Sequence, residues 1–430
     1  MRRWKTDGAV WHHWLIAALA LVGAVAAASP DRLRAEPPVA VRSAFSPQGL
    51  QRVDGYMRNE VAAGKIPGAV VLIQQHGKPV YFRSFGMSDV ATGQPMTADT
   101  IFRLYSMSKP ITSVAAMMLV DDGRLALADP LSKYIPAFAD VRVARERRGE
   151  NGKPELVTEP LERAITIEDL LRQTSGITYG FYGDTPMRKL YAGSDLFDGD
   201  FDNATFVERL ARLPLAEQPA TLWDYGHSTD VLARVVEVVS GQTLFQFEKQ
   251  RLLDPLGMRE TAFYLADGAQ AGRVAEPLPA DRFTRPIAGI VDPVLPRKWE
   301  SGGAGMIGTI GDYARFAQML LNGGTLDGRR YLKPETVALM TSDHIGPGTG
   351  IKRDQFDFPG PDSGFGLGFA VRTVARPPLP IGEYRWDGVG GTFFFIDPHD
   401  DMFTIVMMQA PSQRGRIETE LKRLIYEALE

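Results

Sequence analysis

The chain has 430 residues, of which 44% are hydrophobic and 23% are charged, so it carries enough apolar material for a sizeable globular core. Its 48 Lys and Arg residues nearly balance 52 Asp and Glu residues, which leaves no strongly basic face and makes a nucleic acid an unexpected partner. Cysteine is absent, which excludes disulfides, thiolate metal sites and a cysteine nucleophile. The six histidines show no metal-ligand spacing, so we expect neither a metal nor another cofactor.

The N-terminus has the order of features that is typical of a secretory signal. Three basic residues within the first five positions precede an apolar run, Trp14 to Ala28, that ends in small residues. This run of about fifteen residues is shorter than the ~20 that cross a bilayer, so we expect no stable membrane insertion. We predict that residues 1–28 are a cleaved signal peptide, that residues 29–48 are a polar leader, and that the mature protein is periplasmic or secreted. Cleavage after Ala35 is a second choice.

The elements predicted near the two ends of the chain are strands. Ala69–Ile73 and Val80–Phe82 are β-rich runs separated by a glycine-bearing turn, which indicates a hairpin. A second hairpin is predicted near the other end, from Thr392–Ile396 and Met402–Met407. A further strand is predicted over Phe365–Val371, shortly before the second hairpin.

Helical patterns flank and separate these strands. One lies between Leu50 and Val61, and an amphipathic helix, Arg416–Leu429, closes the chain. Further helices are predicted over Ser106–Asp122, Thr166–Arg172, Ser228–Ser240 and Thr309–Leu321. We therefore predict an α+β fold, in which an antiparallel sheet is flanked by N- and C-terminal helices and a mostly helical region is inserted. This domain would span residues 49–430, with its α/β part in about 49–105 and 295–430 and its helical part in about 106–294.

The residues that point to chemistry begin at Ser106-x-x-Lys109. Pro110 is tolerated only in the first turn of a helix, so we expect the helix to begin at about Ser106. Residues three apart share a helix face, which brings the Ser106 hydroxyl beside the Lys109 amine. The positive end of the helix dipole disfavours the ammonium form, and a neutral lysine can serve as the base that a serine nucleophile needs. The helix that follows is apolar nearly all round, so a lysine at its buried start is costly unless it has a role.

Three ordered motifs resemble those of the class C β-lactamase and family VIII carboxylesterase group, which shares a superfamily with penicillin-binding proteins. They are Ser106-x-x-Lys109, then Tyr225-Gly226-His227 in place of Tyr-x-Asn, and then Trp386-Asp387-Gly388 in place of Lys-Thr-Gly. The similarity extends from about Leu50 to Leu429. Ordered motifs are far more specific together than the Ser-x-x-Lys spacing is alone.

The resemblance implies a role for each matched residue. Ser106 would be the nucleophile, Lys109 its base, and Tyr225 a partner in proton transfer, as a phenolate that protonates the leaving group. The oxyanion hole would consist of the backbone N–H groups of Ser106 and Val389, the latter on an edge strand. The substrate-binding residues would be His227, Trp386, Asp387 and Gly388.

Two departures from the family pattern bear on the substrate. His227 stands where Asn is usual, and Trp386 replaces a cation that engages the carboxylate of a β-lactam. Asp387 would make the site still less favourable for an anion. We therefore expect a serine hydrolase that acts on a small-molecule acyl ester or amide, cleaving esters through an acyl-enzyme. A β-lactamase, a D-amino-acid peptidase and a catalytically silent cell-wall-binding protein on the same fold are the alternatives.

A second serine also resembles a nucleophile. Gly226-x-Ser228-x-Asp230 is close to the Gly-x-Ser-x-Gly elbow of α/β-hydrolases, but Asp230 replaces the last glycine and no apolar strand precedes the motif. We expect Ser228 instead to be the N-cap of a helix that Gly241 ends.

Overall fold

The computed structural model describes residues 44–149, 154–283, 291–356 and 358–430. The predicted signal peptide and most of the predicted leader lie outside the described residues. In the part of the chain that is described, no helix is long and apolar enough to span a membrane.

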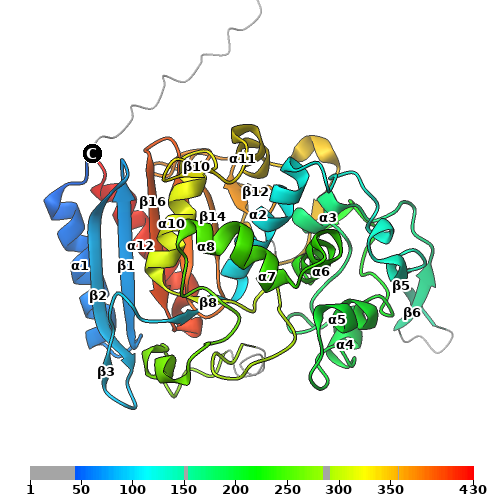
Figure 1. Ribbon diagram of the computed structural model, residues 1–430, viewed down its shortest axis with the longest axis horizontal. Coiled ribbons are helices and arrows are strands. Elements are labelled where there is room, and N and C mark those ends of the chain that lie inside the picture. Colours follow the sequence, from blue (N-terminus) through cyan, green and yellow to red (C-terminus); the bar gives the residue numbers. More distant parts are fainter. Residues whose placement is uncertain (1–43, 150–153, 284–290, 357) are drawn as a thin grey trace, which may run out of the picture. The chain divides into compact units, whose positions relative to one another are not determined.

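An eight-stranded antiparallel sheet is built from both ends of the chain (Figure 1). Its strand order is β12-β13-β14-β15-β16-β1-β2-β3. The strands are β1 Gly68–Gln75, β2 Lys78–Asp89, β3 Gln94–Pro95, β12 Ser363–Phe365, β13 Ala370–Arg372, β14 Tyr384–Asp387, β15 Phe393–Asp397 and β16 Met402–Met408. This arrangement confirms the predicted antiparallel sheet, in which β1 and β16, from opposite ends of the chain, pair in the middle.

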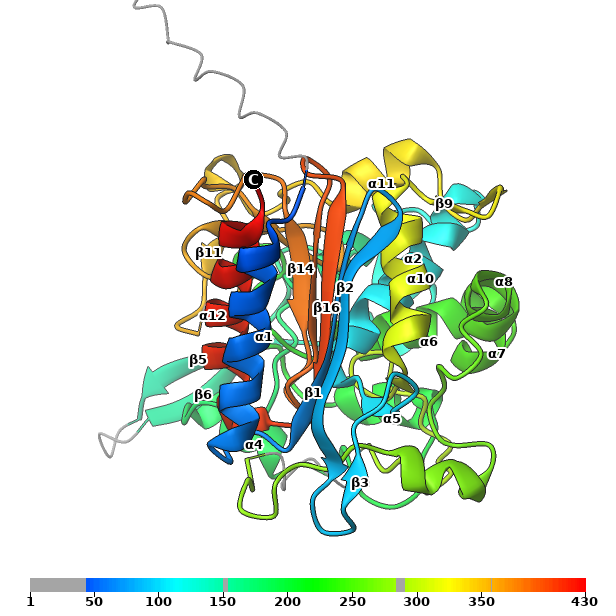
Figure 2. The same ribbon diagram turned by 90° about the vertical axis from the view of Figure 1, so that its left-hand side faces the viewer.

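Helices cover both faces of this sheet (Figure 2). On one face α1 (Pro47–Ala62) and α12 (Arg414–Ala428) lie side by side, and on the other face lie α10 (Ile310–Leu321) and α2 (Ser108–Asp121). The N- and C-terminal flanking helices are thus confirmed.

Side chains of β1 alternate between the two faces, as the two-residue period of a strand requires. Val70 and Leu72 belong to the core shared with α2 and α10, whereas Val71 and Ile73 belong to the core beneath α1 and α12. Because both faces are covered, the strand reads as a continuous apolar run rather than as an alternating one.

The region between β3 and β12 is mostly helical, as predicted. Its other helices are α3 Ile167–Leu171, α4 Pro186–Ala192, α5 Asn203–Leu210, α6 Ser228–Ser240, α7 Leu244–Glu248, α8 Asp254–Leu256 and α11 Pro334–Met340. Its strands form short pairs: β4 Phe102–Arg103 with β8 Ile307–Gly308, β5 Val143–Arg148 with β6 Pro154–Glu159, β7 Leu222–Trp223 with β11 Lys352–Arg353, and β9 Thr325–Leu326 with β10 Arg329–Arg330.

The predicted strand over Phe365–Val371 is wrong, because the chain turns within it. Strands β12 and β13 are two short strands of one hairpin. Gly368 adopts a φ of 102°, which a residue with a side chain rarely reaches, and Gly366 N donates to Phe369 O across the turn at 2.7 Å. The apolar run therefore contains a tight turn rather than one continuous strand.

Candidate active site

Ser106 lies in a tight turn at the start of the buried central helix. A 3₁₀ turn, Tyr105–Met107, leads directly into α2, so the α-helix begins at Ser108, slightly later than predicted. Tyr105 has a φ of 47°, a left-handed backbone that is uncommon for a bulky residue and often found at functional sites. Leu104 N donates to Met306 O at 2.9 Å, which ties the segment before Ser106 to β8.

The Lys109 amine lies beside the Ser106 hydroxyl, as the spacing predicts. Lys109 Nζ is 3.3 Å from Ser106 Oγ, 3.0 Å from the Tyr179 hydroxyl and 2.8 Å from the Gly303 carbonyl oxygen. The residue is only 2% exposed, and burial lowers the pKa of Lys109 to about 7 although the carboxylates of Asp230 and Asp387 act in the opposite direction. A substantial fraction of Lys109 is therefore a neutral amine at neutral pH.

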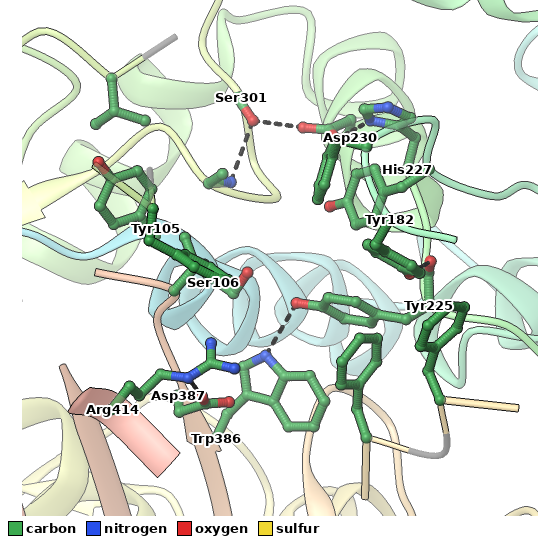
Figure 3. A pocket seen from close by; sticks show the side chains of 18 of the residues that line it. Tyr105, Ser106, Tyr182, Tyr225, His227, Asp230, Ser301, Trp386, Asp387 and Arg414 are labelled. Carbon is green, nitrogen blue, oxygen red and sulfur yellow. Dashed lines mark hydrogen bonds and ion pairs between the residues drawn. The ribbon is translucent and has the colours of Figure 1, made fainter. Parts of the chain in front are cut away.

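Tyr225 lies between Lys109 and Trp386. Lys109 Nζ is 4.5 Å from the centre of the Tyr225 ring, and the Tyr225 hydroxyl accepts a hydrogen bond from Trp386 Nε1 at 3.2 Å (Figure 3). Burial raises the pKa of Tyr225 above its ordinary value, and hydrogen bonding with Ser106 and Trp386 offsets only part of this effect. Since the cation faces the ring rather than the oxygen, the structure favours a neutral phenol and not the predicted phenolate.

The two amides of the predicted oxyanion hole belong to residues that border the same cavity. Among the residues that the structure describes, the N–H groups of Ser106 and Val389 donate to no protein acceptor. The turn that carries Val389 is held by Gly388 N, which donates to Thr392 O at 2.7 Å. The predicted edge position of this strand is wrong, because the β12–β13 hairpin extends the sheet beyond β14.

Gly388 does not contact the cavity, which corrects its predicted substrate-binding role. A Cβ at this position would lie 2.3 Å from the carbonyl oxygen of Leu104, so only glycine lets β14 approach the segment before Ser106 so closely. Gly388 therefore lets the backbone that leads to Val389 lie close to the segment that leads to Ser106.

Ser106 opens into a cavity of about 560 Å³ whose walls are rich in aromatic side chains (Figure 3). The aromatic residues that line it are Tyr105, Tyr179, Phe181, Tyr182, Phe197, Tyr225, Phe283, Trp299, Phe356, Phe358 and Trp386. Four of them, Phe181, Phe197, Phe283 and Phe358, are also substantially exposed to solvent. Such a cavity suits an apolar, uncharged ligand of moderate size.

Charged side chains line one end of the cavity. Asp387 forms an ion pair with Arg414 at 3.1 Å, which offsets part of the repulsion that its charge would exert on an anion. Arg385 donates to Ser363 Oγ at 3.0 Å and to Pro359 O at 2.7 Å. Burial, assisted by Asp387, raises the pKa of Glu418 to about 7. Both arginines of the cavity wall are thus already engaged by protein groups.

His227 lines the cavity but is held mainly by its own helix. It is 3% exposed, and its Nδ1 lies 2.8 Å from the carboxylate of Asp230. Ser228 is the first residue of α6 and makes no capping hydrogen bond, so the predicted N-cap is wrong; its hydroxyl instead lies 2.8 Å from that of Ser175. The helix does end at Gly241, with a φ of 75°, as predicted.

One group of side chains in the described part of the chain is close enough to hold a metal ion. Asp397, His399 and Asp400 lie together at the turn between β15 and β16. Their polar atoms bond to one another and to Tyr426, whose hydroxyl donates to Asp397 at 3.0 Å. None of them lines the cavity, so the group takes no part in the chemistry at Ser106.

Several residues of the site carry no motif in the sequence. Tyr179 and Gly303 complete the surroundings of the Lys109 amine, and Arg414 compensates Asp387. In the sequence, Asp230 is notable only as the residue that replaces the last glycine of the nucleophile-elbow pattern. The small residues at positions 301–303 bring the Gly303 carbonyl to Lys109. Such a run is a weak sign in the sequence that the backbone passes close to another element.

A Ser-x-x-Lys pair whose lysine is buried, a tyrosine ring next to that lysine and two unengaged amides define a serine hydrolase of the β-lactamase fold. Comparison with known proteins identifies the family to which the chain belongs. The protein-family model described as Beta-lactamase matches residues 53–427, and the chain belongs to this family.

Its relatives include two curated proteins and a solved structure that align with most of the chain. Protein Rv1367c of Mycobacterium tuberculosis is 36% identical over 82% of this chain and 88% of its own length. Esterase EstB of Burkholderia gladioli is 32% identical over 80% of this chain and 86% of its own length. The solved structure of EstCE1, described as a hydrolase with promiscuous acyltransferase activity, is 28% identical with a TM-score of 0.70, covering 88% of this chain and 99% of that one. The chain is thus similar to esterases as well as β-lactamases.

Proposed function

We propose that this serine hydrolase cleaves carboxylic esters through an acyl-enzyme formed on Ser106. The observation that carries the proposal is the buried amine of Lys109, 3.3 Å from Ser106 Oγ, with a pKa that burial lowers to about 7. Within the described ranges no carboxylate forms an ion pair with this lysine, so its neutral form is available as a base near neutral pH.

In the acylation step, neutral Lys109 accepts the hydroxyl proton as Ser106 Oγ bonds to the ester carbonyl carbon. The negative charge that develops on the carbonyl oxygen is stabilised by the amides of Ser106 and Val389, which suit this role because they have no other acceptor among the described residues. When the tetrahedral intermediate collapses, the carbon–oxygen bond to the alcohol breaks. The Tyr225 phenol gives its proton to the departing alkoxide and regains one from Lys109.

Deacylation reverses these roles. Water attacks the acyl carbon, its proton passes through Tyr225 to Lys109, and the same two amides stabilise the second oxyanion. Collapse of this intermediate releases the carboxylic acid and returns the proton to Ser106. An alcohol in place of water would give a new ester, so acyl transfer is the same chemistry with a different acceptor.

The cavity supports an uncharged, apolar ester as the substrate. Its walls are rich in aromatic side chains, and Trp386 occupies the place of the cation that meets a β-lactam carboxylate in the related motif. Arg414 is paired with Asp387 and Arg385 with backbone and hydroxyl oxygens, so an anionic substrate would have to displace an existing partner. The similarity to proteins named as esterases agrees with this reading.

A panel of substrates tests the proposal. We expect kcat/KM for p-nitrophenyl butyrate to exceed that for a chromogenic cephalosporin by at least about 100-fold, because the anion loses roughly 3 kcal/mol of interaction that a free cation would supply. D-amino-acid peptides should be hydrolysed no faster than the cephalosporin. The measurement is initial rate against substrate concentration for the mature enzyme. Faster opening of the cephalosporin, or faster peptide cleavage, would overturn the ester proposal in favour of the β-lactamase or peptidase alternative.

A further inference from the structure

A chain of hydrogen bonds connects the Asp230 carboxylate to the Lys109 amine. Ser301 Oγ donates to Asp230 Oδ1 at 2.6 Å and accepts a hydrogen bond from Ala304 N at 3.1 Å (Figure 3). Ala304 N and the Gly303 carbonyl belong to one peptide group, and that carbonyl accepts from Lys109 Nζ at 2.8 Å. The chain therefore runs from the Asp230 carboxylate through the Ser301 hydroxyl and the Gly303–Ala304 peptide group to Lys109 Nζ.

The Asp230 carboxylate is fully engaged by this network. It is 3% exposed and lies in the first turn of α6. Oδ1 also accepts a hydrogen bond from Gly303 N at 3.1 Å, and Oδ2 lies 2.8 Å from His227 Nδ1. Burial alone would raise the pKa of Asp230, but its hydrogen bond and charge interaction with His227 and the charge on Lys109 lower it below the ordinary value. Asp230 is therefore an anion at neutral pH.

The loop of Gly303 fits against α6 so closely that only glycine is accommodated there. A Cβ on Gly303 would lie 2.9 Å from Asp230 Oδ2, and a Cβ on Gly302 would lie 2.8 Å from the Ala233 side chain. Contacts this short leave the backbone little freedom to move relative to Asp230. The position of the Gly303 carbonyl is thus set by the helix that carries Asp230.

We propose that Asp230 is a positioning residue for the catalytic base, and that it acts on Lys109 through Ser301 and the Gly303 peptide. His227, in the place of the family's usual Asn, serves this arrangement by engaging the second carboxylate oxygen rather than by binding substrate. The inference rests on the proposed function, in which Lys109 is the base for Ser106.

Two physical effects follow from this arrangement. A hydrogen-bond chain that begins at an anion polarises each group along it, so the Gly303 carbonyl becomes a stronger acceptor and fixes Lys109 Nζ beside Ser106. The negative charge also favours the ammonium form, which opposes the effect of burial. A base with a pKa too far below the working pH is weak, so this opposition keeps Lys109 strong enough to deprotonate Ser106.

The groups that face the Lys109 amine come from every surrounding element. Ser106, Tyr179 and Tyr225 are neutral, the last two because burial raises their pKa values. Asp230 is the largest of the influences that raise the pKa of Lys109, and Asp387 is the next. Because Arg414 compensates Asp387, removal of the charge on Asp230 is expected to have the larger effect.

The test is the pH dependence of covalent labelling of Ser106 by a fluorophosphonate, which needs no knowledge of the natural substrate. In Asp230→Asn the shape is kept and the charge is lost, so the pKa of Lys109 should fall. The acid limb of the labelling rate should move about one pH unit lower, and the plateau rate should fall about tenfold. Asp312→Asn is the matched control, since Asp312 is also a buried carboxyl group in the first turn of a helix, α10, but does not line the cavity. This control variant should leave the acid limb of the labelling rate within a few tenths of a pH unit of its wild-type position.

A second variant keeps the inference testable if Asp230→Asn does not fold. Ser301→Ala retains the Asp230 charge and removes only the hydroxyl link, so we expect the plateau rate to fall roughly fivefold with a smaller displacement of the limb. An acid limb at the wild-type pH in folded Asp230→Asn, or a wild-type plateau in Ser301→Ala, would overturn the proposal. Failure of the wild-type enzyme to be labelled at Ser106 would instead overturn the proposed function itself.

Discussion

Ser106→Ala is expected to abolish both ester turnover and labelling by a fluorophosphonate, with a loss of at least about 10³-fold in kcat. Among the serines that the structure describes, only Ser106 has its hydroxyl next to the Lys109 amine and opens into the cavity beside two unengaged amides. Removing it takes away the atom that forms the covalent bond, whereas binding of the ester through the aromatic walls is retained. The measurements are steady-state kinetics with p-nitrophenyl butyrate and detection of the label on the intact protein.

Ser228→Ala is the matched control for this prediction. Ser228 belongs to the elbow-like motif, but its hydroxyl is buried and lies 2.8 Å from that of Ser175. No basic side chain of the described residues is its partner. We expect the variant to keep its label and most of its turnover, with a loss of about 1 kcal/mol in the free energy of unfolding from the broken hydrogen bond. If labelling persists in Ser106→Ala and disappears in Ser228→Ala, the nucleophile has been assigned to the wrong serine.

Lys109→Arg is expected to lower kcat by about 10³-fold while the fold survives. A guanidinium cannot lose its proton in the working range, so it keeps a positive charge next to Ser106 but cannot accept the hydroxyl proton. The exposed Lys133, whose amine pairs with Asp129 at 3.0 Å, offers the control substitution Lys133→Arg, which should leave kcat unchanged. Circular dichroism would establish that both variants are folded. Near-normal turnover in folded Lys109→Arg would mean that this lysine is structural.

The wild-type enzyme should show the titration of Lys109 in its pH profile. Burial lowers the pKa of this amine to about 7, and only its neutral form accepts a proton. The value of kcat/KM should therefore rise about tenfold per pH unit below 7 and level off above it. Because the pKa of Glu418 is also raised to about 7, the same profile must be recorded for Glu418→Gln. Loss of the acid limb in that variant would reassign the titration to Glu418.

The parts of the fold and site that could be predicted are those that depend on residues close together in the sequence. The hairpins near both ends predicted the antiparallel sheet, because β-rich runs and the turns between them are properties of short segments. The Ser106-x-x-Lys109 spacing brought hydroxyl and amine together, because a helical turn fixes residues three apart on one face. Ile111 to Leu119 is buried throughout, as its continuous apolar character indicated.

The remaining features depend on segments distant in the chain. Arg414 pairs with Asp387 only because α12 packs beside the end of β14. No residue near Asp387 in the sequence indicates that α12 lies there. Similarly, the carboxylate of Asp230 reaches Lys109 through a loop about seventy residues further along, which no motif spacing records. The protonation state of Tyr225 was also misjudged, since it depends on burial and on which part of its ring the amine faces.

The most direct test of the account is to trap the acyl-enzyme. The wild-type protein is mixed with p-nitrophenyl butyrate, quenched in acid within seconds, and measured by intact mass spectrometry followed by peptide mapping. We predict that the protein gains the mass of one butyryl group and that the modified peptide carries it on Ser106, with no such gain in Ser106→Ala. Ester turnover at full rate with the acyl group on another residue would contradict the account.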